Sequence, residues 1–177
     1  MSFPSNVLAL AQNIQKELTE LGASSKKISN SENTTEIFDE MVTNNALRKK
    51  TEKLFKDGHH ARAVEEAYKL LDNIVKNKAE LRKSSLSGSS LMQKVFTPNK
   101  PILRLNAGGS VSEQDEQNGY MQIYAGCMTG IRNPRAHDSD WEDTEERALQ
   151  LIVFANHLIE RAQLSELSDT PIPPTSN

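Results

Sequence analysis

Aromatic residues, cysteines and long apolar runs are scarce in this chain. Aromatic residues make up 5% of its 177 positions, and Cys127 is the single cysteine. A lone cysteine forms no disulfide within its own chain, so we expect a protein of the reducing cytoplasm, with Cys127 packed in the interior. No apolar stretch approaches the roughly 20 residues that span a bilayer, and no basic and apolar leader opens the chain. No histidine and cysteine cluster has zinc-ligand spacing. We therefore expect no membrane segment, no secretion signal, and no metal or other cofactor.

Charge, by contrast, is plentiful and unevenly placed. Charged residues make up 25% of the chain, the formal net charge is -3 and the mean hydropathy is -0.60, a balance typical of a soluble helical protein. Residues 76–104 contain seven basic side chains and one acidic side chain, whereas residues 138–177 contain nine acidic and two basic ones. Nucleic-acid binding depends on a local basic surface more than on total charge, so the basic stretch is a candidate binding surface. An ordinary solvated face explains the same lysines equally well.

Apolar residues recur at helical spacing along most of the chain, which predicts an all-α protein. The most regular stripe runs from Ala61 to Val75. Two stretches interrupt the pattern: a polar linker over 22–34, and an irregular region over 84–110 with a short apolar helix near 91–96 and an extended piece near 102–105. The predicted long helices cover about 5–21, 37–57, 59–79 and 115–132, and a final helix reaches about residue 163. These elements predict an N-terminal helical segment (1–54), a helical domain (55–163) and a flexible tail (164–177).

Local signals suggest where these helices begin and end. Ser112 or Asp115 is expected to cap the helix that carries Tyr120 and Tyr124. Residues 139–142 have the form of a capping box for the final helix. Pro134 is expected to force Asn133 into extended geometry, so that the preceding helix ends near residue 132 or 133. The proline-rich residues 171–174 are expected to be disordered.

Residues 131–137, which read IRNPRAH, lie between the last two predicted helices and contain the most informative motif. Arg132 offers a planar fork of donors that matches phosphate oxygens. His137 can gain or lose a proton near neutral pH. A cation, the polar Asn133 and an imidazole within one short segment are suited to phosphodiester chemistry.

The helical context of this motif resembles the HEPN superfamily. That family's signature is an arginine, usually followed by a polar residue, and a histidine after four to six intervening residues. Arg132, Asn133 and His137 match it, and residues 58–67 (GHHARAVEEA) resemble the family's first core helix. The resemblance covers roughly residues 55–163, and the chain looks most similar to the Ymh-like, prophage-associated proteins linked to abortive infection.

The resemblance implies a bundle of helices that dimerises through the motif-bearing helices and acts as a metal-independent endoribonuclease in antiviral defence or as a toxin. Arg132, His137 and Asn133 would be the catalytic residues. Candidate contacts to the RNA backbone are Arg135, Lys94, Lys100 and Arg104. A partner protein that restrains or activates the enzyme is a further expectation.

Each of these residues also has a structural alternative. His137 can serve a helix junction, Arg132 can bind the last carbonyls of its own helix, and Asn133 before Pro134 is a common turn signal. Arg135 can be a surface charge, and Trp141 can pack at the junction. Two other functional classes therefore stay open: an inactive HEPN module that dimerises or docks a partner enzyme, and a helical regulator that binds nucleic acid without cutting it.

Overall fold

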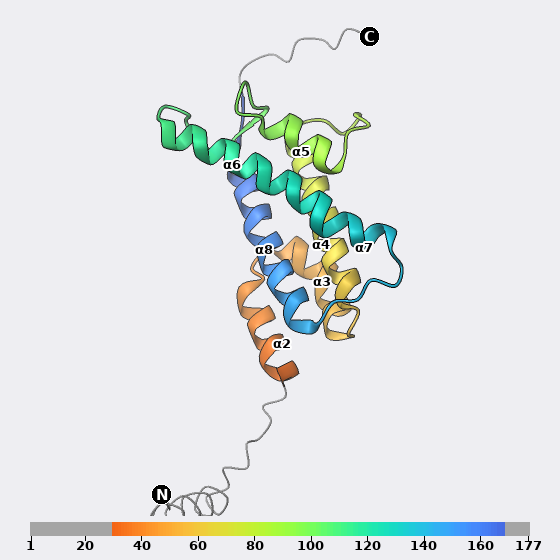
Figure 1. Ribbon diagram of the computed structural model, residues 1–177. Helices are drawn as coiled ribbons and strands as arrows, with labels where there is room; N and C mark the ends of the chain where they lie inside the picture. Colours follow the sequence, from red (N-terminus) through yellow and green to blue (C-terminus); the bar gives the residue numbers. More distant parts are fainter. Residues whose placement is uncertain (1–29, 169–177) are drawn as a thin grey trace, which may run out of the picture.

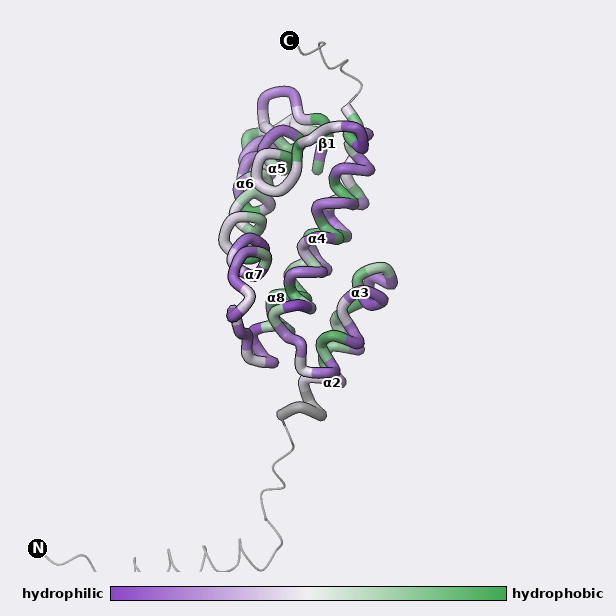
Figure 2. The backbone as a smooth tube through the Cα atoms, turned by 90° about the vertical axis from the view of Figure 1, so that its right-hand side faces the viewer, coloured by the Kyte–Doolittle hydropathy of each residue, from purple (hydrophilic) through white to green (hydrophobic). Residues whose placement is uncertain are grey.

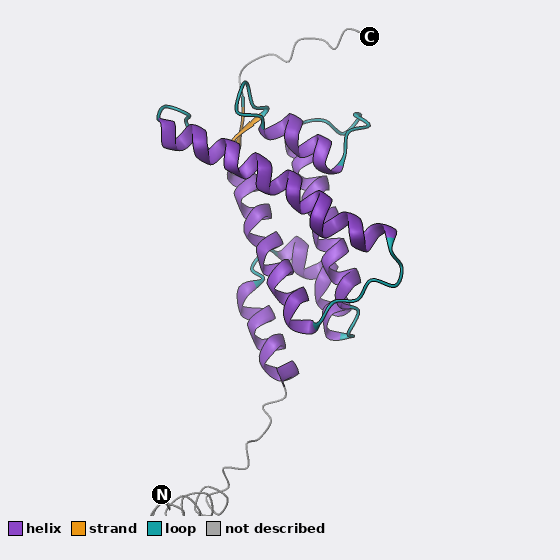
Figure 3. Cartoon of the chain, in the orientation of Figure 1, coloured by secondary structure: helices purple, strands orange, loops and turns teal. Residues whose placement is uncertain are grey.

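The computed structural model of the protein describes residues 30–168, and it is almost entirely helical, which confirms the all-α prediction (Figures 1 and 3). Helices α2 (Asn30–Met41) and α3 (Asn45–Lys56) precede the long α4 (His60–Lys78) and the short α5 (Gly88–Phe96). Helix α6 (Val111–Cys127) continues through the π-helical turn η1 (Met128–Arg132) into α7 (Asn133–His137), and α8 (Glu145–Leu164) follows. Strands β1 (Leu103–Arg104) and β2 (Glu166–Leu167) form a short antiparallel ribbon.

The helices form three layers around α4 and α8. These two helices run parallel, since the Tyr68 hydroxyl near the middle of α4 donates to the carbonyl of Leu151, and the Lys78 ammonium at its end donates to that of Gln163. Figure 2 shows α5, α6 and α7 on one side of this pair and α3 on the other. Figure 2 also shows hydrophobic and hydrophilic residues alternating along the helices, as expected where each helix buries one stripe.

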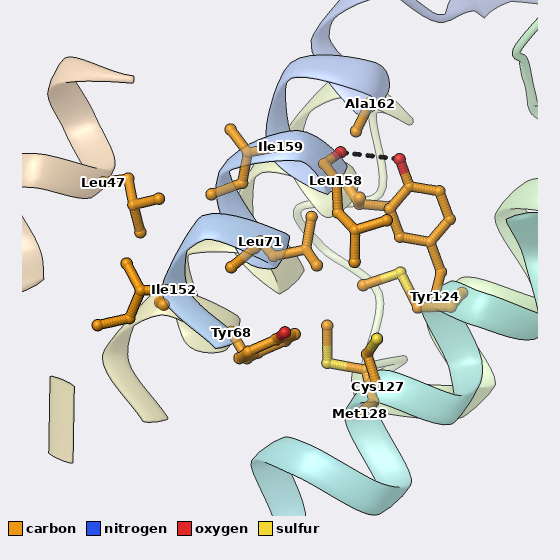
Figure 4. Packing of buried hydrophobic residues seen from close by; sticks show 14 of the residues in the cluster. Leu47, Tyr68, Leu71, Tyr124, Cys127, Met128, Ile152, Leu158, Ile159 and Ala162 are labelled. Atoms are coloured by element: carbon orange, nitrogen blue, oxygen red, sulfur yellow. Dashed lines mark hydrogen bonds between the residues drawn. The ribbon is translucent and has the colours of Figure 1, made fainter. Parts of the chain in front are cut away.

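The core lies where α4, α6 and α8 meet (Figure 4). Tyr68, Tyr124 and Met128 are fully buried, and the Tyr124 hydroxyl donates a 2.8 Å hydrogen bond to the carbonyl of Leu158. Cys127 is buried beside them, as predicted, and burial raises the pKa of its thiol to about 11. A thiol with so high a pKa stays protonated at neutral pH.

The N-terminal half of the bundle differs from the prediction. One helix was expected over about 37–57 and a linker before it, but the chain forms two helices from residue 30 onward. The Asn44 side chain explains the break, because its Oδ1 accepts hydrogen bonds from the backbone N–H groups of Ala46 and Leu47 and so starts α3. Phe38 and Leu47 belong to the same buried cluster as α4 and α8, although both precede the expected boundary at residue 55. The predicted helix over 5–21 lies outside the described residues.

The predicted starts of α6 and α8 were wrong for a similar reason, because the chain uses a different capping residue nearby. Ser110 caps α6 in a reciprocal capping box with Glu113, in place of Ser112 or Asp115. Thr144 caps α8, so residues 139–142 are not its capping box. Helix α5 begins at Gly88, before the expected residue 91. The extended piece near 102–105 is confirmed, but its partner is β2, which lies within the supposed tail. Residues 171–174 fall outside the described part.

Candidate functional site

The motif residues lie on one nearly continuous helical rod made of α6, η1 and α7 (Figure 1). The prediction that Pro134 ends the helix at Asn133 was wrong, because Asn133 has helical dihedrals of φ -63° and ψ -43°. The π-helical turn supplies the physical reason. The N–H of Asn133 donates to the carbonyl of Met128, five residues earlier, so the backbone is widened just before a proline that has no N–H of its own.

Two of the three motif side chains contact each other, and the third is exposed. Arg132 and Asn133 are half-buried, and Nη1 of Arg132 donates to Oδ1 of Asn133 at 3.3 Å. His137 is exposed. Five residues on a helix correspond to about 140° of rotation and roughly 7.5 Å of rise, so Arg132 and His137 leave the rod on different sides. On an ideal helix these two positions of one chain therefore do not share a face.

Arg135 is part of a buried ion pair, which contradicts the expectation of a surface charge. Its side chain is 1% exposed, and its Nε and Nη2 atoms donate to the Asp143 carboxylate at 2.6 and 2.7 Å. Its Nη1 donates to the carbonyl of Ile131 at 2.6 Å. A guanidinium buried to this degree has no surface to offer an RNA phosphate, so the predicted substrate contact does not fit its position. Arg135 instead fastens α7 to the start of α8.

Trp141 completes this anchor, in agreement with the expectation that it packs at the junction. The guanidinium carbon of Arg135 lies 5.4 Å from the centroid of the Trp141 ring, and that of Arg147 lies 5.9 Å from it. Both distances are typical of cation–π contacts. Arg147 also approaches Asp143 at 3.5 Å. The role of Asp143 as the partner of Arg135 could not be predicted from the sequence. Asp143 lies in the loop between α7 and α8, where no helical spacing relates it to Arg135.

A cavity of about 510 Å³ adjoins this anchor at the start of α4. His59, His60 and Arg62 line it on one side, and Asp138 and Trp141 line it on the other. His59 is exposed, and His60 is half-buried against the ring of Phe55. The cavity begins next to His137 but does not include the motif side chains.

The basic stretch lies at the other end of the rod. Lys100 and Arg104 line a separate cavity together with Gln117 of α6. Gln117 precedes His137 by twenty residues, about 30 Å along a helix. Lys94 is exposed on α5. Within one chain, then, the structure does not bring Lys100 and Arg104 together with the catalytic motif.

The outer face of the same rod carries three glycines. Gly119, Gly126 and Gly130 recur near helical spacing, and a Cβ atom added at any of them would meet nothing within 4 Å. Ile123 lies on the same helix and is 40% exposed. Glycine within a helix costs about 1 kcal/mol relative to alanine. No packing contact among the described residues requires these three glycines.

Comparison with known proteins identifies the family. Residues 42–162 match the family described as "Protein of unknown function (Hypoth_ymh)". The chain belongs to the Ymh family. The Ymh match includes the whole of α3 to α7 and begins before residue 55, in agreement with the place of Leu47 in the common core. No curated protein and no solved structure matches the chain. Among residues 30–168 of this Ymh protein, no group of three or more His, Cys, Asp or Glu is arranged to hold a metal ion, and no helix is long and apolar enough to cross a membrane.

Proposed function

We propose that this Ymh protein is a HEPN-type endoribonuclease that needs no metal and acts as a homodimer in antiviral defence or as a toxin. The observation that carries the proposal is the position of Arg132, Asn133 and His137 at the end of a helical rod whose open side carries three glycines. All three side chains reach the surface to some degree, and none belongs to the buried core.

The chemistry follows from what RNA itself supplies. The 2'-hydroxyl of the ribose attacks the adjacent phosphorus, and the bond from phosphorus to the 5'-oxygen of the next nucleotide breaks. One His137 takes the proton from the 2'-hydroxyl, and a protonated imidazole gives a proton to the leaving 5'-oxygen. Arg132 stabilises the charge that develops on the phosphate oxygens, and Asn133 orients its guanidinium through the 3.3 Å hydrogen bond. The products are a 2',3'-cyclic phosphate and a 5'-hydroxyl.

A second copy of the chain would resolve the divergence of the motif side chains. Arg132 and His137 of one chain point to different sides of the rod, so a two-fold axis near the motif would let His137 of one protomer serve the phosphate held by Arg132 of its partner. The three glycines favour such a dimer, because helices without side chains at their contact can approach closely. Their cost of about 1 kcal/mol each is then offset by contacts between protomers.

Cleavage is tested with purified protein and total RNA in EDTA, followed by mapping of the product ends. We expect the wild type to leave cyclic-phosphate or 3'-phosphate ends, and His137→Ala to leave the RNA intact. His59→Ala is the matched control, because His59 is also an exposed histidine but lies outside the motif. Equal cleavage by the wild type and His137→Ala would refute the assignment of this histidine.

Dimerisation is tested separately by sedimentation. Gly126→Leu places a bulky side chain on the glycine face, at a position where an added Cβ atom meets nothing within 4 Å. We expect this variant to be monomeric and inactive. Gln150→Leu, at an exposed position of α8, adds similar apolar surface elsewhere and is expected to leave the dimer unchanged. A dimer that survives Gly126→Leu with unchanged affinity would show that this face is not the interface.

One observation favours a second candidate function. Because about 140° of helical rotation separates Arg132 and His137 within one chain, the same glycine face can serve a catalytically inactive dimerisation module that docks a partner enzyme. This alternative predicts a dimer that leaves RNA intact, and in which His137→Ala changes neither RNA nor assembly. Toxicity on expression that is relieved by His137→Ala separates the two candidates in cells.

A further inference from the structure

The cavity at the far end of the rod carries an inference of its own. Its volume is about 480 Å³, and it lies between the loop after α5 and the first turns of α6. Six polar residues contribute to its lining: Asn99, Lys100, Arg104, Asn106, Gln114 and Gln117. Pro98 and Pro101 add an apolar side. A site of this size accommodates a ligand of one or two nucleotides and excludes a duplex.

Gln117 holds the wall of this cavity in place. It is 5% exposed, and its carboxamide oxygen accepts from the N–H of Leu105 at 2.9 Å. Its amide nitrogen donates to the carbonyls of Phe96 and Leu103 at 3.0 and 3.2 Å. These three bonds fix the chain on both sides of Lys100 against α6. The cavity is therefore formed before any ligand arrives.

The lining favours an anion with hydrogen-bonding edges. Among the described residues that line the cavity, two are cations and none carries a carboxylate. Two acids lie nearby: Glu113 accepts from the N–H of Ser110 at 2.9 Å, and Glu116 binds both Arg161 at 2.5 Å and, at 2.8 Å, the side chain of Asn106, which lines the cavity. Glu166 faces Arg104 in the register of the ribbon but does not line the cavity.

We propose that this cavity binds a phosphodiester segment of single-stranded RNA at a distance from the catalytic motif. Lys100 and Arg104 would contact the backbone phosphates, and the amide side chains of Asn99 and Gln114 would meet base edges. The proposal rests on the proposed ribonuclease function for its choice of ligand. Since Gln117 lies about 30 Å from His137 along the rod, a strand held here extends well beyond the scissile bond.

The test measures binding without cleavage. The His137→Ala protein is titrated into a fluorescent single-stranded RNA of about 15 nucleotides, and the dissociation constant is followed by anisotropy at several salt concentrations. Lys100→Gln and the double change Lys100→Gln, Arg104→Gln are compared with Lys49→Gln, an exposed lysine of α3. We expect the double variant to bind roughly tenfold more weakly. We also expect the salt slope to fall by about 0.7 for each cation removed.

The outcomes separate this site from the proposed function. Weaker binding and a shallower salt slope in the Lys100 variants, with Lys49→Gln unchanged, support the site whether or not the wild type cuts RNA. Unchanged binding in Lys100→Gln and in the double variant overturns the site, even if wild-type cleavage is intact. An equal loss of RNA affinity in Lys49→Gln also overturns the site, and so does equal displacement of the RNA by an acidic peptide of the same charge. In either case the binding is a general attraction between opposite charges. If the double variant fails to fold, Lys100→Gln decides alone, since Lys100 is exposed in a loop.

Discussion

Removing the Asp143 carboxylate should destabilise this protein more than any surface change. The side chains of Asp143 and Arg135 are 0% and 1% exposed, and two hydrogen bonds of 2.6 and 2.7 Å join them. Asp143→Ala leaves the guanidinium buried with only the carbonyl of Ile131 as a remaining hydrogen-bond partner. Loss of one member of a buried pair costs about 3–5 kcal/mol in the free energy of unfolding.

Urea denaturation followed by circular dichroism measures this loss. With a denaturant slope of about 2 kcal/mol per molar urea, the midpoint should fall by roughly 1.5–2.5 M. Asp57→Ala is the control, because Asp57 pairs with Lys53 at a similar 2.5 Å but the Lys53 side chain is 86% exposed. An exposed pair of this kind contributes less than about 1 kcal/mol.

A double change tests the physical cause. Replacing both partners by apolar residues, Arg135→Met with Asp143→Leu, removes the unpaired charge and should recover most of the lost stability. If Asp143→Ala costs no more than Asp57→Ala, the pair does not anchor α7 and the reasoning is refuted. If the double variant is as unstable as Asp143→Ala, the loss comes from packing around Trp141 and not from the stranded charge.

Three further predictions concern buried polar groups. Cys127 should react with iodoacetamide at pH 8 far more slowly in the folded than in the urea-unfolded protein. Folding raises the pKa of its thiol from 9.0 to about 11. The contribution of this thiol to stability is therefore present below pH 9 and should be lost as the pH rises toward 11. Tyr124→Phe should lower the free energy of unfolding by about 1 kcal/mol, measured in urea, since it removes the hydrogen bond to Leu158; no change would mean that this bond has no net value. Burial raises the pKa of the Glu65 carboxyl, but its bonds to Lys69 and to a neighbouring arginine outweigh this effect and lower the pKa overall. The contribution of Glu65 to stability is therefore present above the unfolded pKa near 4.5 and should be lost as the pH falls below that value. Glu65→Gln should flatten the acid limb of the profile of unfolding free energy against pH, and an unchanged limb would contradict the assignment.

The fold class and most helices could be predicted because each helix of this bundle buries one stripe of residues. The stripe from Ala61 to Val75 has the 3.6-residue spacing of α4, and the buried side chains of α4 confirm it. Helix ends were less predictable. Ser110, Asn44 and Thr144 cap their helices, yet nearby serine, threonine and aspartate residues offer the same local chemistry, and only packing selects among them.

By itself, the sequence determined the all-α class, the interior place of Cys127 and the segment that holds Arg132, Asn133 and His137, because these depend on local spacing and composition. Tertiary structure alone decided the surroundings of that segment. The π-helical turn carries the helix through Pro134, the fold buries Arg135 against Asp143, and the length of α6 separates the basic stretch from the motif. These features depend on contacts between residues that the chain brings together only when the rod packs across α4 and α8, and no local pattern encodes them.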